Sequence, residues 1–193
     1  MGTAMQPDLP VNATPEVDPL DNATGCCPRF HPEHWDRQSL HFREKRFVRA
    51  VTRSQDHVPV DMDEVFPRTF EAITDAGALD AAHPLVLSRD LSPQQAEHLF
   101  AIDGDVPGAE IVTLSGHYRT RVFDAPYQEA PLLLGGFARE LAHEGEQVLE
   151  SCVFYPVCPA CSQAYGHNYM VVVEKVGEGK SGEVTGGESA ASS

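Results

Sequence analysis

Basic residues are scarce in this sequence. The 193 residues include 14 Lys and Arg against 29 Asp and Glu, which gives a formal net charge of −15. A field of that sign repels phosphate backbones and anionic lipid head groups, so the composition argues against nucleic acid and membrane surfaces as partners. The acidity itself indicates solubility, or adaptation to a salty interior.

Long hydrophobic runs are also missing. No stretch approaches the roughly 20 apolar residues that a membrane-spanning helix needs. Residues 1–22 lack both the charged and the apolar segment of a secretory signal, so we expect a cytoplasmic protein. In that compartment, the five cysteines are expected to be metal ligands, redox groups or core residues rather than a disulfide framework.

Two catalytic signatures are absent as well. There is no glycine-rich phosphate loop, and there is no Gly-x-Ser-x-Gly nucleophile elbow. The sequence therefore gives no support to a nucleotide-binding enzyme or to a serine hydrolase of the α/β type. What is present is an apolar fraction of 41%, enough for the core of one domain.

Hydrophobic periodicity places that domain at residues 25–176. Residues 1–24 and 177–193 are rich in Pro, or in Gly, Ser and Glu, and are expected to be disordered. Between them, the order strand, helix, strand, strand occurs twice. This predicts an α+β fold: a duplicated strand-helix-strand-strand unit that forms an antiparallel sheet with two helices on one face.

The boundaries within each repeat depend on a few residues. Asp61 and Glu64 resemble a capping box before the first helix. Pro67 favours a first regular turn near Phe66, and Gly77 ends the helix. In the second repeat, Ser115-Gly116 is expected to divide residues 110–123 into two strands.

A Cys-Pro-x-Cys motif precedes the last strand. Two residues between Cys158 and Cys161 allow both thiolates to reach one ion, and Cys26 and Cys27 can complete the ligand set if the N-terminal loop crosses the sheet edge. This predicts a structural zinc site, with metal-free cysteines that cover the end of the sheet as the alternative. A thioredoxin-like redox role is disfavoured because the motif is expected to lead into a strand rather than a helix.

Five polar residues are candidates for contact with a ligand or for catalysis. Asp124 precedes the second helix and is either an N-cap or a carboxylate that activates water. His57 can serve as a base near neutral pH, or it can be an ordinary hydrogen-bonded histidine. Tyr127 and Tyr155 are either donors in a groove or core residues. Asn168 is either a turn residue or a ligand contact.

Four motifs carry a family resemblance; they are Cys26–Phe30, His57–Pro59, Phe123–Tyr127 and Cys158–Tyr169. They resemble the GyrI-like small-molecule-binding superfamily, and more closely a bacterial family loosely labelled "hydrolase". That family carries Cys-Cys-Pro-x-Phe, His-x-Pro, Phe-Glu-Gly-Pro-Tyr and Cys-Pro-x-Cys-x-x-x-Tyr-Gly-x-Asn-Tyr in this order. Here Asp-Ala replaces Glu-Gly, and Val153 stands where the superfamily often has a pocket glutamate.

The resemblance implies two repeats that face each other across a groove for a small organic molecule. The expected lining is Phe66, Tyr127, Phe137, Tyr155 and Tyr169, with His57, Asp124 and Asn168 as polar contacts. The first functional prediction is therefore a zinc-stabilised small-molecule-binding domain.

Two alternatives stay open. Some members of the superfamily hydrolyse strained electrophilic ligands, which implies a hydrolase of reactive small molecules. Asp124 or His57 would then activate water, and Tyr127 or Tyr155 would donate a proton to the leaving atom. The other alternative is an interaction protein whose only chemistry is its zinc ion.

Overall fold

The computed structural model describes residues 9–178. The elements are α1 (Pro32–Trp35), β1 (Ser39–Gln55), β2 (Val58–Pro59), α2 (Met62–Asp75), β3 (Val86–Ser92), β4 (Gln95–Ala101), β5 (Ile111–Asp124), η1 (Tyr127–Glu129), α3 (Ala130–His143), β6 (Glu146–Phe154), α4 (Pro159–Tyr165) and β7 (Tyr169–Glu178). Of the terminal segments expected to be disordered, residues 1–8 and 179–193 lie outside this range. Residues 9–24 follow an irregular path that hydrogen-bonds to the domain, for example from the Asn12 amide to the His41 carbonyl.

The seven strands form one antiparallel sheet in the order β2-β1-β4-β3-β6-β7-β5. Its two halves are β1–α2–β3–β4 and β5–α3–β6–β7, which confirms the predicted duplicated unit. The halves meet where β3 pairs with β6 through Ser88 and Val153. They meet again where β5 pairs with β1. Both ends of the series of paired strands from β1 to β5 are therefore joined to each other.

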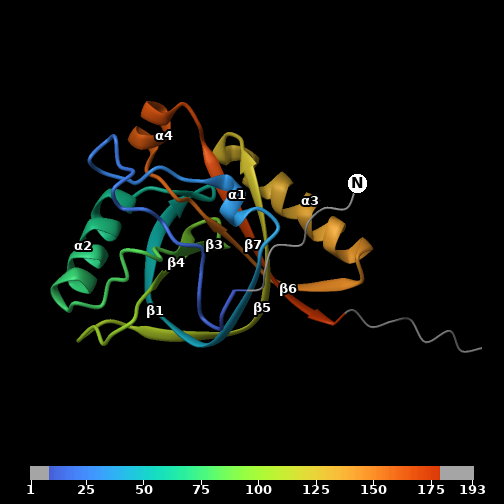
Figure 1. The fold of residues 1–193 in the computed structure, drawn as a ribbon, viewed down its shortest axis with the longest axis horizontal. Coiled ribbons are helices and arrows are strands. Elements are labelled where there is room, and N and C mark those ends of the chain that lie inside the picture. Colours follow the sequence, from blue (N-terminus) through green and yellow to red (C-terminus); the bar gives the residue numbers. More distant parts are fainter. Residues whose placement is uncertain (1–8, 179–193) are drawn as a thin grey trace, which may run out of the picture.

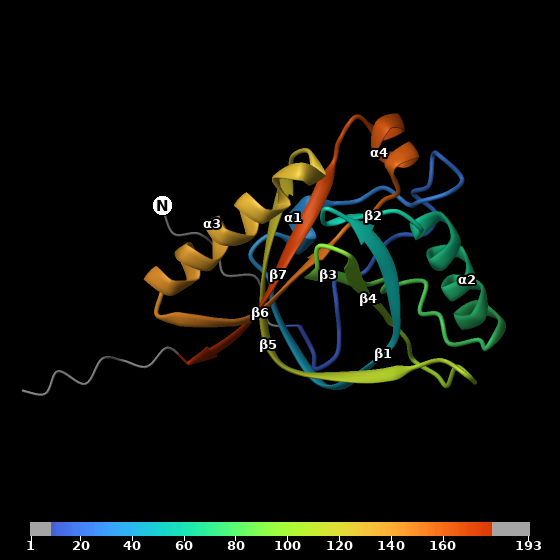
Figure 2. The same ribbon diagram turned by 180° about the vertical axis from the view of Figure 1, so that it is seen from behind.

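β1 can serve two neighbours because it is long and bent. Residues 39–48 pair with β5, and residues 47–53 pair with β4. A register shift between Phe42 and Lys45 marks the bend, and Glu44 there has a positive φ of 49°. The predicted break at Ser115-Gly116 is wrong: β5 is one continuous strand, because the bulge lies in β1 opposite it. Figure 2 shows both strands strongly curved.

The two long helices cover the same face of the sheet, as predicted. Ile73 of α2 packs in a cluster with Val48 and Phe100 of the sheet. Phe137 and Leu141 of α3 pack in a cluster with Val172. Figure 1 shows the two helices at opposite sides of the molecule, one over each repeat.

The other face of the sheet carries the largest apolar cluster. It contains Phe42, Phe47 and Leu99, together with Trp35 of α1, which is almost completely buried. Phe30 packs there as well, with its ring 5.4 Å from that of Tyr169. The protein's own N-terminal segment therefore packs against this face.

The start of α2 differs from the prediction. The helix begins at Met62, and Pro67 lies inside it, where it cannot donate the usual backbone hydrogen bond. Asp61 is the N-cap residue but makes no side-chain cap bond. Its carboxylate instead accepts hydrogen bonds from the Arg53 amide at 2.9 Å and the Arg53 guanidinium at 2.8 Å. Gly77 follows the helix with a φ of 66°, as expected for its end.

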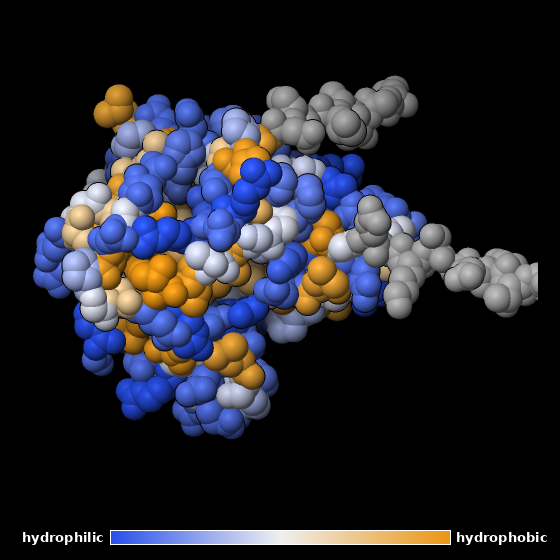
Figure 3. Space-filling view, turned by 90° about the horizontal axis from the view of Figure 1, so that it is seen from below, coloured by the Kyte–Doolittle hydropathy of each residue, from blue (hydrophilic) through white to orange (hydrophobic). Residues whose placement is uncertain are grey.

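The surface agrees with the acidic composition. Figure 3 shows hydrophilic side chains over most of the visible face, with apolar ones in separate patches between them. In the part of the chain that is described, no helix combines the length and the apolar character required to cross a membrane.

Candidate metal centre

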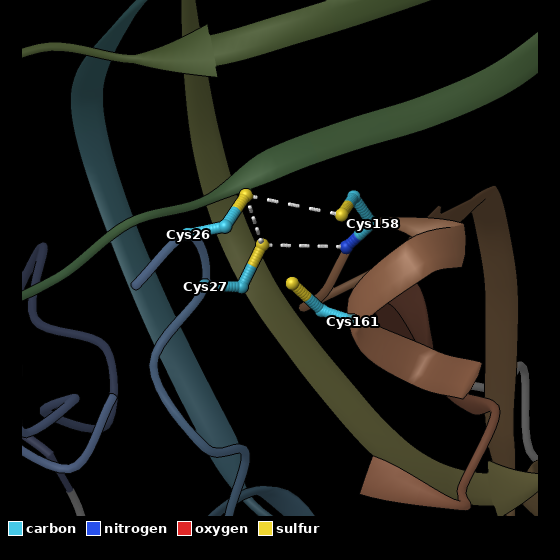
Figure 4. Close-up of side chains that lie close together, drawn as sticks. All are labelled: Cys26, Cys27, Cys158 and Cys161. Carbon is cyan, nitrogen blue, oxygen red and sulfur yellow. Dashed lines mark hydrogen bonds between the residues drawn. The ribbon is translucent and has the colours of Figure 1, made fainter. Parts of the chain in front are cut away.

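Two distant parts of the chain bring four cysteines together. Cys26 and Cys27 lie in the loop before α1, while Cys158 is the N-cap residue of α4 and Cys161 lies in its first turn. Pro159 begins this helix, a position at which proline loses no hydrogen bond. Figure 1 shows α4 beside the N-terminal loop, and Figure 4 shows the side chains of the four cysteines gathered between the two segments.

The sulfur positions suit a metal ion. All four Sγ atoms lie within 4.8 Å of one another. Cys26 Sγ lies 3.8 Å from Cys27 Sγ and 4.0 Å from Cys158 Sγ. Four thiolates placed tetrahedrally about 2.3 Å from a zinc ion would be about 3.8 Å apart. The four cysteines can therefore hold a metal ion with little movement.

Neighbouring groups hold the thiols in place. The Cys158 amide donates to Cys27 Sγ at 3.5 Å, and Cys161 Sγ hydrogen-bonds the Thr24 hydroxyl at 3.3 Å. The Tyr165 hydroxyl donates to the Cys27 carbonyl at 2.8 Å. The α4 side of the site is thus tied to the N-terminal loop by bonds besides those to an ion.

The surroundings of the four cysteines give two of the thiols very different pKa values. Burial raises the pKa of Cys27 to about 12. The hydrogen bond with Thr24 lowers the pKa of Cys161 to about 7. A bound cation favours the thiolate form of every ligand and would release protons on binding.

The turn expected around the Cys-Pro-x-Cys motif is instead the short helix α4, so the predicted passage directly into a strand is wrong. The order is strand, Cys-Pro-x-Cys, helix. The sequence favours this because Cys158 caps a helix that Pro159 begins, and Gly166 ends it with a φ of 78°.

Asp124 neither caps a helix nor lines a cavity with Tyr127. Its carboxylate accepts from His167 Nδ1 at 2.7 Å and from the Asn168 amide at 2.8 Å, and these bonds lower its pKa. Asn168 Nδ2 donates to the Ala125 carbonyl at 2.6 Å. Together these contacts join the end of β5 to the start of β7. The residue before the following 3-10 helix is Pro126.

The remaining predicted groove residues do not share one cavity. Phe66 packs in the cluster beneath α2, and Phe137 packs in the one beneath α3. Tyr169 lies against the cluster on the opposite face of the sheet. Tyr127 is more than half exposed.

His57 lies at the edge of the first repeat. It follows β1 with a positive φ of 68°, and its Nδ1 lies 3.1 Å from the carboxylate of Asp90. Asp90 belongs to β3. His57 is therefore joined to the strand that meets the second repeat.

Two of the hollows in the described part of the chain lie near predicted site residues or histidines. A small one of about 100 Å³ lies between α2 and the junction of the repeats, and Tyr155 lines it; the other lining residues are Phe70, Ile73, Leu79, Pro84, Leu85, Val86, Phe100, Ala101, Phe154 and Pro156. Burial and the charge of Asp90 raise the pKa of Tyr155. The other hollow, of about 720 Å³, is open and lies around His41, His117 and Arg119.

A buried polar network lies two residues along β3 and β4 from Val86 and Phe100, which line the small hollow. His98 Nε2 is 2.9 Å from Thr52 Oγ1, and His98 Nδ1 is 2.8 Å from Ser88 Oγ. Sequence analysis missed this network because its members come from three strands and form no motif. The alternation along each strand was the only signal, since it directs all three residues to the helix-covered face.

The fold and the cysteine cluster define a class: an α+β domain of two repeats in which four cysteines from near its two ends meet and could hold a metal ion. The sequence is matched by the family model described as "Bacterial hydrolase" over residues 17–176. The chain therefore belongs to the bacterial hydrolase family. Among curated proteins, none matches the sequence significantly.

Solved structures share the fold at low sequence identity. An uncharacterized conserved protein from Listeria innocua is 9% identical with a TM-score of 0.53, and a hydrolase from the same organism is 10% identical with a TM-score of 0.51; each alignment covers 74% of this chain and 92% of the other. SAV2435 bound to tetraphenylphosphonium is 11% identical over 74% of this chain and 94% of that one, with a TM-score of 0.47. The first two show a common architecture.

Proposed function

We propose that this chain is a small-molecule-binding domain stabilised by a structural zinc ion. The observation that supports zinc is the meeting of four thiols, from segments more than 130 residues apart, at separations close to those of a tetrahedral site. Four soft sulfur ligands favour zinc or iron over magnesium or calcium. With all four positions taken by protein, none remains for a substrate, so the ion has a structural role.

Metal analysis of the purified protein tests this part. We expect near-stoichiometric zinc, and we expect Cys158→Ser to lower both the zinc content and the melting temperature. Loss of a link of this kind costs about 2–5 kcal/mol, which corresponds to about 10 °C for a chain of this size. Cys152→Ser is the control, because Cys152 is a buried free cysteine outside the cluster. Metal-free protein with unchanged stability would contradict the proposal.

The hollow beside Tyr155 supports the binding of a small molecule. Its walls are mostly apolar, with the Tyr155 phenol as a polar group at the edge. A volume of about 100 Å³ admits a small apolar group rather than a drug-sized compound, since known pockets for the latter are about 300 Å³ or larger. On this proposal, the hollow over the first repeat takes the place of the larger groove of the GyrI-like superfamily.

Thermal shift with small aromatic alcohols, such as phenol and benzyl alcohol, tests binding. We expect the melting temperature to rise with ligand concentration. Leu79→Trp should abolish the shift, because Leu79 lines the hollow and is partly exposed, so that the larger ring can fill the space. Leu91→Trp is the matched control at an exposed leucine outside the hollow. An equal shift in both variants would place any binding elsewhere.

A hydrolase is the second candidate. The buried network around His98, rather than Asp124, is the observation that favours it. Asp124 already accepts two hydrogen bonds, which suits a role in positioning β5 and β7. An interaction protein with no ligand and no turnover would show neither the thermal shift nor hydrolysis.

A further inference from the structure

Ser88, His98 and Thr52 form a chain of hydrogen bonds across three neighbouring strands. Thr52 belongs to β1, His98 to β4 and Ser88 to β3. Thr52 and His98 are almost completely buried, whereas Ser88 is only partly buried. When the Ser88 hydroxyl donates to Nδ1, the ring proton resides on Nε2 and is donated to Thr52. The histidine is then held in the tautomer that can accept the serine proton.

Ser88, the less buried end of this chain, lies two residues along β3 from Val86, which lines the small hollow. Val86, Ser88 and Asp90 are successive residues on the helix-facing side of β3. Ser88 is registered with Val153 of β6. Tyr155, which also lines the hollow, follows two residues later. On the other side, Phe66 of α2 closes over His98, with the ring centroids 4.8 Å apart.

We propose that Ser88 is the nucleophile of an esterase site, with His98 as its base and Thr52 as a positioning residue. The proposal rests on the proposed function in one respect: the small hollow would receive the apolar acyl group of the substrate. The substrates are therefore esters of short apolar acids. A nucleophile, a base in hydrogen-bond contact with it and a third group that orients the base are the elements of covalent acyl transfer.

The reaction balances with water as the only co-reactant. Ser88 Oγ bonds to the ester carbonyl carbon while its proton moves to His98 Nδ1. The bond from that carbon to the alcohol oxygen then breaks, and the alcohol leaves with the proton from Nδ1. Water next attacks the acyl-serine, passes one proton through Nδ1 to Ser88 Oγ, and releases the acid.

The surroundings of His98 predict the pH profile. Burial lowers its pKa to about 4, and the charges of Glu97 and Asp61 oppose this shift only in part. His57 and Asp90 lie farther along the same face. The imidazole is therefore neutral and able to accept a proton above about pH 5. Hydrolysis should lose its rate below that pH rather than near pH 6.5, where an ordinary histidine titrates.

Covalent labelling is the direct test. The zinc-loaded full chain is incubated with diisopropyl fluorophosphate, and the modified residue is located by peptide mass spectrometry. We expect one label, on Ser88, and parallel loss of p-nitrophenyl acetate hydrolysis. Ser88→Ala should abolish the label and lower the rate by about 100-fold or more. Ser151→Ala, at the corresponding register position opposite β7, should retain both.

Thr52→Val distinguishes a positioning role from a structural one. It should lower kcat and shift the pH midpoint of the reaction, while KM stays within about twofold. An unlabelled wild-type protein, or equal hydrolysis by wild type and Ser88→Ala, would overturn the esterase proposal. A thermal shift with phenol that persists in such a protein would leave the binding proposal intact, so the two failures can be told apart.

Discussion

The two repeats have the same architecture but bury different chemistry beneath their helices. In each, a serine lies opposite a buried titratable residue: Ser88 opposite His98 in the first, and Ser151 opposite Glu174 in the second. Both ring nitrogens of His98 are hydrogen-bonded. Neither carboxylate oxygen of Glu174 makes a hydrogen bond of good geometry among the described residues, and the neighbouring Ser151 hydroxyl offsets the effect of burial only in part.

This difference shows that duplication of a fold does not duplicate a site. In the first repeat, the buried polar group has hydrogen-bond partners and lies near a hollow. In the second, burial raises the pKa of Glu174 to about 7, and the Ser151 hydroxyl opposes this shift. Burial disfavours the charged form of a carboxylate, so we expect Glu174 to lower the stability of the fold at alkaline pH.

Of the two substitutions that test this comparison, Glu174→Gln should change the free energy of unfolding the most. The pKa of Glu174 rises on folding from 4.5 to about 7, so the folded state holds a proton that the unfolded chain loses between these values. The contribution of Glu174 to stability therefore falls as pH rises through this window and is constant above it. Relative to wild type, the variant should gain about 2–3 kcal/mol between pH 5 and pH 8. Urea unfolding at both pH values measures this difference.

The comparison between variant and wild type is necessary because His98 has the opposite effect. Its pKa falls on folding from 6.5 to about 4, so its contribution to stability is lost as pH falls through that window. The two slopes oppose each other between about pH 4.5 and pH 6.5 in the wild-type protein. A variant whose advantage does not grow with pH would show that Glu174 is hydrated or paired in solution.

Thr52→Val should have a smaller effect, in the first repeat. The substitution preserves shape but leaves a buried ring N–H of His98 without an acceptor, at a cost of about 1–3 kcal/mol. Because the lost bond is neutral, this cost should hardly change between pH 6.5 and pH 8. The same urea titration measures it. A cost below about 0.5 kcal/mol would mean that water replaces the threonine as hydrogen-bond partner. The buried polar group of the first repeat would then be no better hydrogen-bonded by the protein than that of the second.

Features of the chain that depend on local spacing could be predicted from the sequence. The duplicated order of elements follows from alternating and helical hydrophobic patterns, and the cluster of four cysteines follows from Cys26-Cys27 and the spacing of Cys158 and Cys161. The helix after Cys158 was missed because a short segment with proline and small residues is read equally well as a turn.

The polar groups beneath the helices could not be predicted in the same way. Ser88 and His98 are ten residues apart, and they meet only because a hairpin aligns them. Glu174 follows three valines and precedes a lysine. This pattern does not predict whether Glu174 is buried, because its burial depends on the packing of α3. The predicted groove residues are spread over both faces of the sheet, and the sequence does not show that Trp35 and Phe30 pack on the face opposite the helices.

The position of the cysteines along the chain has a consequence for the unfolded protein. Cys26 and Cys158 are separated by 132 residues, so an ion that held both pairs would close a ring containing most of the polypeptide. In the chain-entropy treatment of cross-links, a ring of that size restricts the denatured ensemble by about 5 kcal/mol at 25 °C. A metal at the margin of the domain would thus act on every residue between its ligands.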